Sequence, residues 1–228
     1  MVSSQKKGGF SIIELLISIS IFTIRTAIVI VDYPKFSSGL VVETVAQEIA
    51  LTIRTAQSYG LSVKSAAVFN PNVTPRTFGV HFRTTTAGNA SDLSDKKTIL
   101  IFQDDVCGGA PLYPPDGIYT ASSPCGTSEK VETSRIQTQE SITKLCLGLL
   151  SPGGGGNPDS PTGSAVCTTK GTDYLDITFT RPDPKGTIAA SFAGGSFFGD
   201  AEVIITNPKG GRKMVVFWET GQIYVQNI

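Results

Sequence analysis

The sequence predicts an α+β protein in which one long N-terminal helix packs on an antiparallel β-sheet domain. An apolar run over residues 10–31 leads into a helical pattern that ends near Tyr59, and short alternating runs separated by turn residues follow. Apolar residues at three- and four-residue steps indicate an amphipathic helix, whereas strict alternation indicates half-buried strands. We therefore divide the chain into residues 1–9, 10–33, 34–60 and 61–228.

The apolar run is long enough to cross a membrane, because a helix rises about 1.5 Å per residue and this one would reach roughly 33 Å. Lys6 and Lys7 precede it, and basic residues keep their end of such a segment in the cytoplasm. Glu14 and Arg25 interrupt the run. A carboxylate near the bilayer interior costs a few kcal/mol and usually marks function.

Two simpler interpretations of this segment stay open. Ser18-Ile19-Ser20 imitates the cleavage site of a secretory signal, although the apolar run before it is short and already contains Glu14. A plain membrane anchor explains the length of the run, but it does not explain Gly8-Gly9 or Glu14.

The run Lys7-Gly8-Gly9-Phe10-Ser11-Ile12-Ile13-Glu14-Leu15-Leu16 resembles the class III signal of type IV prepilins and type II secretion pseudopilins. The resemblance implies that residues 1–9 are a prepilin leader. It implies cleavage after Gly9 by a prepilin peptidase, N-methylation of Phe10, and assembly through Glu14 and the free amine of a neighbouring subunit. Tyr33 falls where many pilins carry a tyrosine. Arg25 departs from the family pattern, and we expect it to reach the outer interface or another subunit.

The physical chemistry of Glu14 agrees with this implication. A buried carboxylate is tolerated when it gains a cation, and the cut would create one, the Phe10 ammonium. A neighbouring subunit's amine could reach Glu14 in a staggered bundle. Low local dielectric would strengthen the pair.

A second helical pattern follows Pro34, which we expect to interrupt the helix or to end its membrane half. Polar residues lie largely off its apolar stripe, namely Glu43, Gln47, Glu48, Thr52 and Arg54. Gly60 is a candidate end of the helix. The stripe consists of Val42, Val45, Ala46, Ile49, Ile53 and Ala56.

The remainder predicts strands at residues 77–83, 98–102, 175–180, 203–205, 214–218 and 223–225, with two hairpins at the C-terminus. One or two further strands are expected in residues 130–149. Residues 104–128 and 151–171 are expected to be long loops.

Four cysteines, Cys107, Cys125, Cys146 and Cys167, follow the predicted anchor. An even number in an exported domain suggests disulfides. Three pairings are possible, and we favour Cys107–Cys125 with Cys146–Cys167 because each closes a loop rich in Gly, Pro and Ser. A zinc site is disfavoured, since no cysteines lie close together and His81 is the only histidine.

The residues give little support for catalysis, a cofactor or a metal. We expect His81 to be a solvent-facing strand residue, and nothing places two carboxylates in a cleft. Asp104-Asp105 and Asp159 do not match a spaced calcium loop. The chain is therefore expected not to be an enzyme.

The balanced charge of 19 basic and 19 acidic residues gives no global case for nucleic acid. Lys209, Arg212 and Lys213 form a candidate cluster for phosphate contact, with a solubility role as the simpler interpretation. Some H-type pilus subunits bind DNA and carry a basic Gly-Arg-x-Arg motif near the C-terminus, which the corresponding Gly221-Gln222-Ile223-Tyr224 lacks. DNA is therefore a disfavoured partner.

Three phenylalanines accompany a glycine-rich stretch: Phe192, Phe197 and Phe198. We expect them to be core or strand-edge residues, and the alternative is an exposed patch for a neighbouring subunit.

The resemblance, which is strong over about the first 30 residues, implies a pilin-like fold and a minor pilin or pseudopilin. The order of the later elements is most similar to the H type. Such a subunit has one transmembrane helix in the inner membrane, a domain in the periplasm or outside the cell, and other pilin subunits and the prepilin peptidase as partners. The alternatives are a major shaft-forming pilin and a DNA-binding competence pilin.

Overall fold

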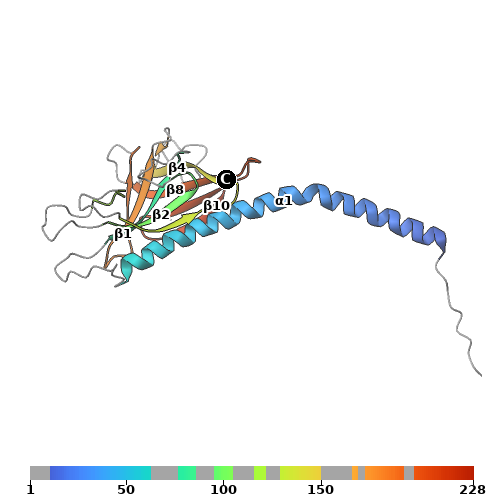
Figure 1. Cartoon of the computed structure of the whole chain (residues 1–228), viewed down its shortest axis with the longest axis horizontal. Helices are drawn as coiled ribbons and strands as arrows, with labels where there is room; N and C mark the ends of the chain where they lie inside the picture. Colours follow the sequence, from blue (N-terminus) through green and yellow to red (C-terminus); the bar gives the residue numbers. More distant parts are fainter. Residues whose placement is uncertain are drawn as a thin grey trace, which may run out of the picture. The chain divides into compact units, whose positions relative to one another are not determined.

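The computed structural model describes residues 11–62, 77–85, 95–104, 116–121, 129–149, 166–168, 173–192 and 198–228. The chain forms two compact units, Met1–Leu40 and Val41–Ile228. One helix, α1 (Ile12–Leu61), contributes to both, and the strands belong to the second unit (Figure 1). The architecture is therefore α+β, with a long N-terminal helix as expected.

Pro34 does not end the helix, contrary to our prediction, because α1 is continuous from Ile12 to Leu61. Proline removes one backbone donor and disturbs one turn, at a cost of about 3 kcal/mol. The backbone is nevertheless helical on both sides of Pro34.

The C-terminal half of α1 supplies one face of the core. The residues of the predicted stripe are all buried, and Thr52, which we expected off the stripe, is buried as well. Gly60 lies inside the helix, where an added Cβ would come within 2.7 Å of the Phe179 Cβ. Its role is thus to let the helix approach a strand closely, and the helix ends one residue later.

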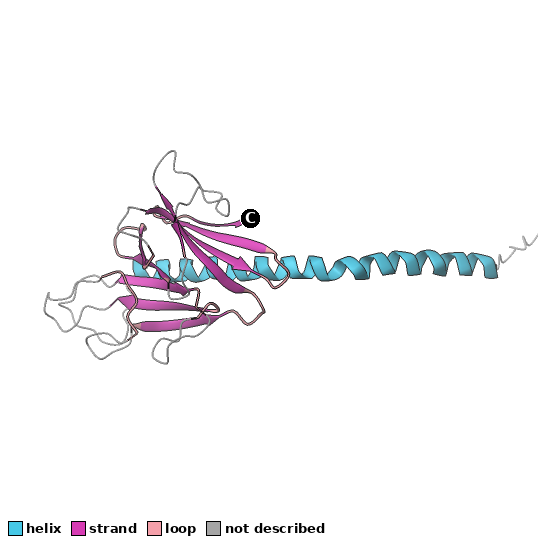
Figure 2. Cartoon of the chain, turned by 90° about the horizontal axis from the view of Figure 1, so that it is seen from above, coloured by secondary structure: helices cyan, strands magenta, loops and turns pink. Residues whose placement is uncertain are grey.

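The strands form two five-stranded antiparallel sheets, where we had expected one sheet. Sheet A has the order β3-β2-β1-β6-β7, and sheet B has the order β10-β9-β8-β4-β5. Figure 2 shows the two sheets as separate groups of strands. The strands of sheet A are β1 (Thr77–Arg83), β2 (Thr98–Asp104), β3 (Lys130–Arg135), β6 (Tyr174–Phe179) and β7 (Gly186–Ala190). Those of sheet B are β4 (Ser141–Leu149), β5 (Val166–Cys167), β8 (Phe198–Thr206), β9 (Arg212–Trp218) and β10 (Ile223–Asn227).

One hydrophobic core joins both sheets to the helix. Ile49 and Ile53 of α1 share it with Ile177 of sheet A and Val215 of sheet B. The sheets also touch directly, since the rings of Phe179 and Phe217 pack edge to face with centroids 5.5 Å apart.

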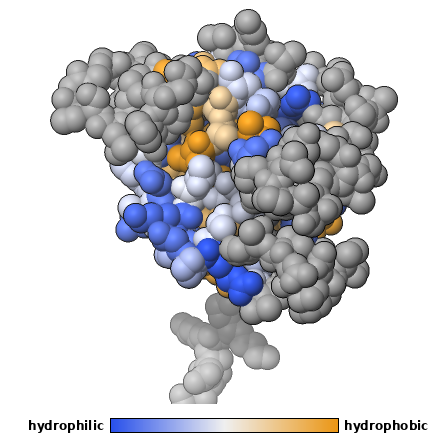
Figure 3. Space-filling model, turned by 90° about the vertical axis from the view of Figure 1, so that its left-hand side faces the viewer, coloured by the Kyte–Doolittle hydropathy of each residue, from blue (hydrophilic) through white to orange (hydrophobic). Residues whose placement is uncertain are grey.

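At the end of the domain turned to the viewer in Figure 3, hydrophobic and hydrophilic side chains adjoin one another on the surface.

A second, smaller apolar cluster lies on the opposite face of sheet B. It contains Cys146, Ile204, Met214 and Val216, with Cys167 and Trp218 packed against it. Cys146 forms the expected disulfide with Cys167, which joins β4 to the short edge strand β5. Cys107 and Cys125 lie outside the described residues.

Replacing Cys146 and Cys167 together with serine is expected to lower the free energy of unfolding by about 2–4 kcal/mol, because the bridge closes a chain segment of 21 residues. Chemical denaturation of the full chain in an uncharged detergent measures the change. Equal midpoints for the variant and the parent, with and without reductant, would contradict a stabilising role for this bridge.

Candidate functional site

The N-terminal half of α1 exposes almost its whole apolar surface. Ile12 is 80% and Val31 71% exposed. An apolar surface of this extent is unfavourable in water and marks a membrane or protein contact. By length and composition, this helix can cross a membrane, and none of its most apolar stretch is buried inside the structure. The large exposed side chains of this stretch are Ile12, Ile13, Leu15, Leu16, Ile17, Ile19, Ile21, Phe22, Ile24, Ile28, Val29, Ile30 and Val31.

The hydroxyl groups of this segment are satisfied within the helix. Ser18, Ser20 and Thr26 donate to the carbonyls of the residues four positions earlier at 2.8 Å. Thr23 donates to the Ser20 carbonyl at 2.9 Å. Side chains bonded in this way need no water or partner to occupy an apolar medium. The charged groups of residues 12–31 are Glu14 and Arg25.

Glu14 lies in the first turn of α1, and its side chain is exposed. Its N–H donates to the carbonyl of Ser11 at 3.1 Å, so the helix begins just before it. The partial positive charge of a helix N-terminus favours a carboxylate at this place. Gly9 and Phe10, the predicted processing residues, lie outside the described residues.

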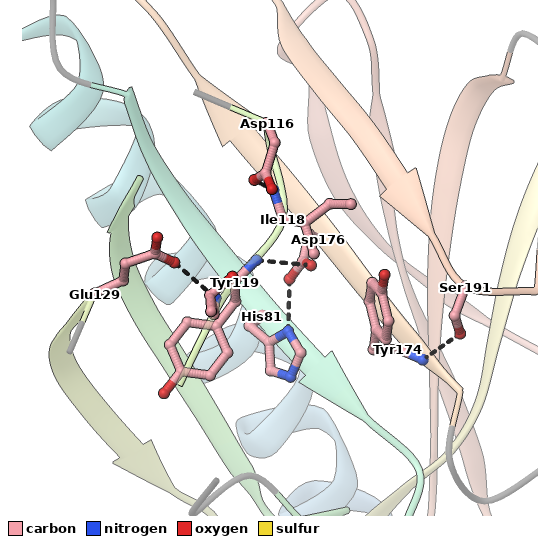
Figure 4. Close-up of polar contacts among 9 residues, drawn as sticks. His81, Asp116, Ile118, Tyr119, Glu129, Tyr174, Asp176 and Ser191 are labelled. Atoms are coloured by element: carbon pink, nitrogen blue, oxygen red, sulfur yellow. Dashed lines mark hydrogen bonds and ion pairs between the residues drawn. The ribbon is translucent and has the colours of Figure 1, made fainter. Parts of the chain in front are cut away.

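A second candidate site lies on the face of sheet A that points away from α1. His81 of β1 is buried, contrary to our expectation of a solvent-facing residue, with 2% of its side chain exposed. Its Nδ1 lies 2.6 Å from Oδ1 of Asp176, a fully buried residue on the neighbouring strand β6 (Figure 4). The strand alternation was predicted correctly, but here both faces of the sheet are covered.

The cover over this pair is the segment of residues 116–121, here called the cover segment. Three buried carboxylates accept hydrogen bonds from its backbone. Asp104 binds the N–H of Gly117 at 2.7 Å, Asp176 that of Tyr119 at 3.2 Å, and Glu129 that of Thr120 at 2.7 Å. These bonds satisfy the N–H groups of Gly117, Tyr119 and Thr120, and the intervening N–H of Ile118 donates to Asp116 at 2.9 Å.

Aromatic rings close the space around the imidazole. The Tyr119 and Tyr174 ring centroids lie 4.8 and 5.8 Å from that of His81, and Tyr119 also packs against Phe102. Gly79 makes room for Phe102, since a Cβ there would come within 2.6 Å of the Phe102 ring. The pair is therefore held in an environment that excludes water.

Burial raises the pKa of the Asp176 carboxyl above its ordinary value, and the adjacent His81 imidazole and the Tyr119 N–H oppose that rise. Burial also raises the pKa of the Tyr174 hydroxyl, assisted by the negative charge of Asp176. A carboxylate that orients an imidazole is one component of a general base. Among the described residues, none forms a hydrogen bond with the buried His81 Nε2, so no nucleophile is hydrogen-bonded to it there.

The predicted basic cluster is divided between two faces of sheet B. Lys213 forms an ion pair with Glu43 of α1, and Gln47 donates to the same carboxylate at 2.9 Å. The hydrogen bond from Gln47, followed by that from Lys213, lowers the pKa of Glu43. Arg212 lies on the opposite face of β9, and Lys209 is exposed in the turn before it. The three cations therefore do not form one surface.

The other sequence-based candidates have the following positions. Phe192 packs against the main core, as expected. Asp105, Asp159, Phe197 and the side chain of Phe198 lie outside the part that the structure describes. Within the described part, no group of three or more His, Cys, Asp or Glu residues could hold a metal ion.

Sequence reasoning missed the His81–Asp176 pair and the cover segment. The signal was present, because His81 and Asp176 both alternate with core residues on predicted strands. The pairing of β1 with β6 joins residues 95 positions apart, and a single sequence does not reveal such a register.

Comparison of the chain with protein-family models, with curated proteins and with solved structures finds no match.

Proposed function

We propose that this protein is a structural subunit, a minor pilin or pseudopilin, of a type IV pilus or type II secretion filament. The observation that carries the proposal is the position of Glu14. This carboxylate opens an exposed apolar helix directly after a sequence that resembles a class III prepilin signal. A helix of this kind serves as a membrane anchor before assembly and as part of a filament core afterwards.

The energetics of the helix support reversible assembly. Its apolar side chains gain little or lose little when lipid contacts are exchanged for contacts with other apolar helices, since both surroundings lack water. The exchange alone does not fix the axial position of one subunit relative to the next. Glu14 would supply the register by pairing with the Phe10 ammonium of a neighbouring subunit. A charge-assisted hydrogen bond fixes the separation of its two groups, and an apolar medium strengthens it.

The second unit supports a role outside the cytoplasm. Its disulfide Cys146–Cys167 is of the kind that persists in oxidising compartments. The buried stripe of α1 is used by its own core, so contacts between subunits would use the exposed side of the helix, where Leu40 and Leu51 lie. The two sheets would then be carried on the surface of the filament.

The intact mass of the protein isolated from membranes and from sheared filaments tests this proposal. We expect a chain that begins at Phe10, carries one added methyl group and lacks two hydrogens for each disulfide. Gly9→Leu should retain residues 1–9, whereas the matched variant Gly8→Ala should be processed normally. Retention of Met1–Gly9 by the parent protein wherever it accumulates would overturn the proposal.

A further inference from the structure

The first half of α1 carries one acid and one base, Glu14 and Arg25, in the otherwise uncharged span of residues 12–31. Both side chains are exposed. Among the described residues, none forms a hydrogen bond or an ion pair with either side chain. Ser18, one turn after Glu14, donates its hydroxyl hydrogen to the Glu14 backbone carbonyl and not to the carboxylate. Each charge therefore needs a partner from another molecule once the span is enclosed away from water.

The spacing of the two charges determines where they lie on the helix, which is continuous across both. Arg25 follows Glu14 by eleven residues, which is three turns plus about 20°, so both lie on one face, about 16.5 Å apart along the axis. Side chains of one helix meet when they are three or four residues apart. Glu14 and Arg25 are therefore too far apart to pair within one chain, although they share a face.

The two charges are complementary to those of a second copy of the same segment. Every copy supplies one carboxylate and one guanidinium, so a row of copies can match all charges except those at its two ends. In parallel helices, an axial shift of about 16.5 Å brings Arg25 of one copy level with Glu14 of the next. Copies without a shift would place like charges level with one another, which is unfavourable. The charges thus favour a staggered arrangement of copies.

We propose that Glu14 and Arg25 form an ion pair between staggered copies of this chain, in which the guanidinium of one helix donates to the carboxylate of the next. The parallel arrangement of the copies rests on the proposed function. Arginine suits such a pair, because its planar group can donate two hydrogen bonds to one carboxylate. Because both charges share a face, one helix can use Glu14 toward the neighbour on one side and Arg25 toward the neighbour on the other.

This pair is compatible with the contact between Glu14 and the Phe10 ammonium. A carboxylate has about four acceptor positions, so it can accept from two donors at once. The contact with Phe10 needs a shift of four residues, about 6 Å, whereas the contact with Arg25 needs about 16.5 Å in the opposite direction. The two donors would therefore come from different neighbours, and Glu14 would join three copies.

Incorporation of Arg25 variants into filaments tests the pair. Arg25→Gln should enter the membrane at least as well as the parent, because it removes a charge from the apolar segment. Its incorporation into filaments should fall at least about tenfold, the change expected for loss of a charge-assisted hydrogen bond. Arg25→Lys, which keeps the charge, should assemble better than Arg25→Gln.

The matched control exchanges two neighbouring residues, Arg25→Thr together with Thr26→Arg. The exchange keeps the composition and the charge of the segment but turns the cation by about 100° around the helix. We expect this variant to assemble as poorly as Arg25→Gln. Incorporation of either variant at the level of the parent, in filaments of processed chains, would overturn the pair and leave the proposed function intact.

Cross-linking without a spacer identifies the partner of position 25. In filaments of Arg25→Lys, a membrane-permeant carbodiimide should join the new amine to the Glu14 carboxyl of another copy as an amide, with the water passing to the reagent. Peptide mapping by mass spectrometry locates the bond. The same reagent should join Phe10 to Glu14 in the parent and in the variant, which reports the contact of the proposed function separately.

The cross-links separate failure of this pair from failure of the proposed function. A product between Phe10 and Glu14 without one from position 25, or a product from position 25 to Asp32 in place of Glu14, would overturn the pair alone. A parent chain that retains Met1–Gly9 and forms no filament would overturn the proposed function, and the pair with it.

Discussion

Replacing Asp176 with alanine is expected to destabilise the folded domain by about 3–5 kcal/mol, the usual cost of removing one member of a buried polar pair. The change leaves His81 Nδ1 and the N–H of Tyr119 without their acceptor in a site that excludes water. Urea denaturation of the full chain, followed by circular dichroism, measures the loss. Asp183→Ala, which removes an exposed aspartate beside β7, should cost less than about 1 kcal/mol.

Asp176→Asn separates the charge from the hydrogen bonds. The amide oxygen can still accept from His81, but its NH2 group would face the N–H of Tyr119, so we expect an intermediate loss. The cover segment should then exchange its amide hydrogens faster in both variants. Unchanged exchange at residues 117–120, together with unchanged stability, would show that the pair does not hold this segment.

The pH dependence follows from the raised pKa of Asp176. The native state retains this proton more tightly than the unfolded chain does, whose aspartates titrate at about pH 4. The contribution of the group to stability is therefore present below about pH 4 and is lost as the pH rises through the native pKa. Comparison of the parent with Asp176→Asn should show this loss in the parent alone. Other groups that ionise or carry charge face the carboxyl, namely Tyr174, Arg83 and His81. The quantity to compare is therefore the difference between the unfolding free energies of the parent and the variant at each pH.

Replacing Glu14 with alanine is expected to leave membrane insertion intact and to reduce incorporation into filaments at least about 100-fold. The substitution removes a costly charged group from the apolar segment, which favours insertion. It also removes the acceptor for a neighbour's ammonium, and loss of a buried ion pair worth about 3 kcal/mol corresponds to a factor of this size. Quantitative immunoblots of the membrane and filament fractions give both numbers.

Glu14→Gln and Glu48→Gln are the matched controls. The first keeps the shape and one acceptor but removes the charge, so it should assemble poorly as well. The second neutralises an exposed carboxylate on the same helix, which contacts Ser134 of β3, and it should assemble as the parent does. Incorporation of all variants at the level of the parent would show that Glu14 has no role in assembly.

The elements that follow from short-range pattern were predicted well. The stripe on α1 from Val42 to Ala56 and the C-terminal hairpins of β8, β9 and β10 are where periodicity and turn residues indicated them. Periodicity reports local geometry, and these elements pair or pack with close neighbours in the chain. The strand β7 was missed because its sequence, Gly-Thr-Ile-Ala-Ala, has few residues that favour strands.

The features that depend on distant partners were not predicted. The division into two sheets arises from the pairing of β1 with β6 and of β4 with β8, and no local signal specifies either. His81 was expected to be exposed because alternation tells which residues share a face, not whether another segment covers that face. The bulge at Thr143 is a register shift of one residue, which shows only when the partner strand is known.

The hydroxyl groups along the first half of α1 have a consequence for the speed of any transfer between lipid and protein surroundings. Ser18, Ser20, Thr23 and Thr26 carry their acceptors with them, so a transfer of this segment from lipid to protein contacts would leave these hydrogen bonds intact. The side chains of residues 12–31 that such a transfer would still have to accommodate as charges are Glu14 and Arg25. A helix with unbonded serines would have had to release and recapture a partner at every step.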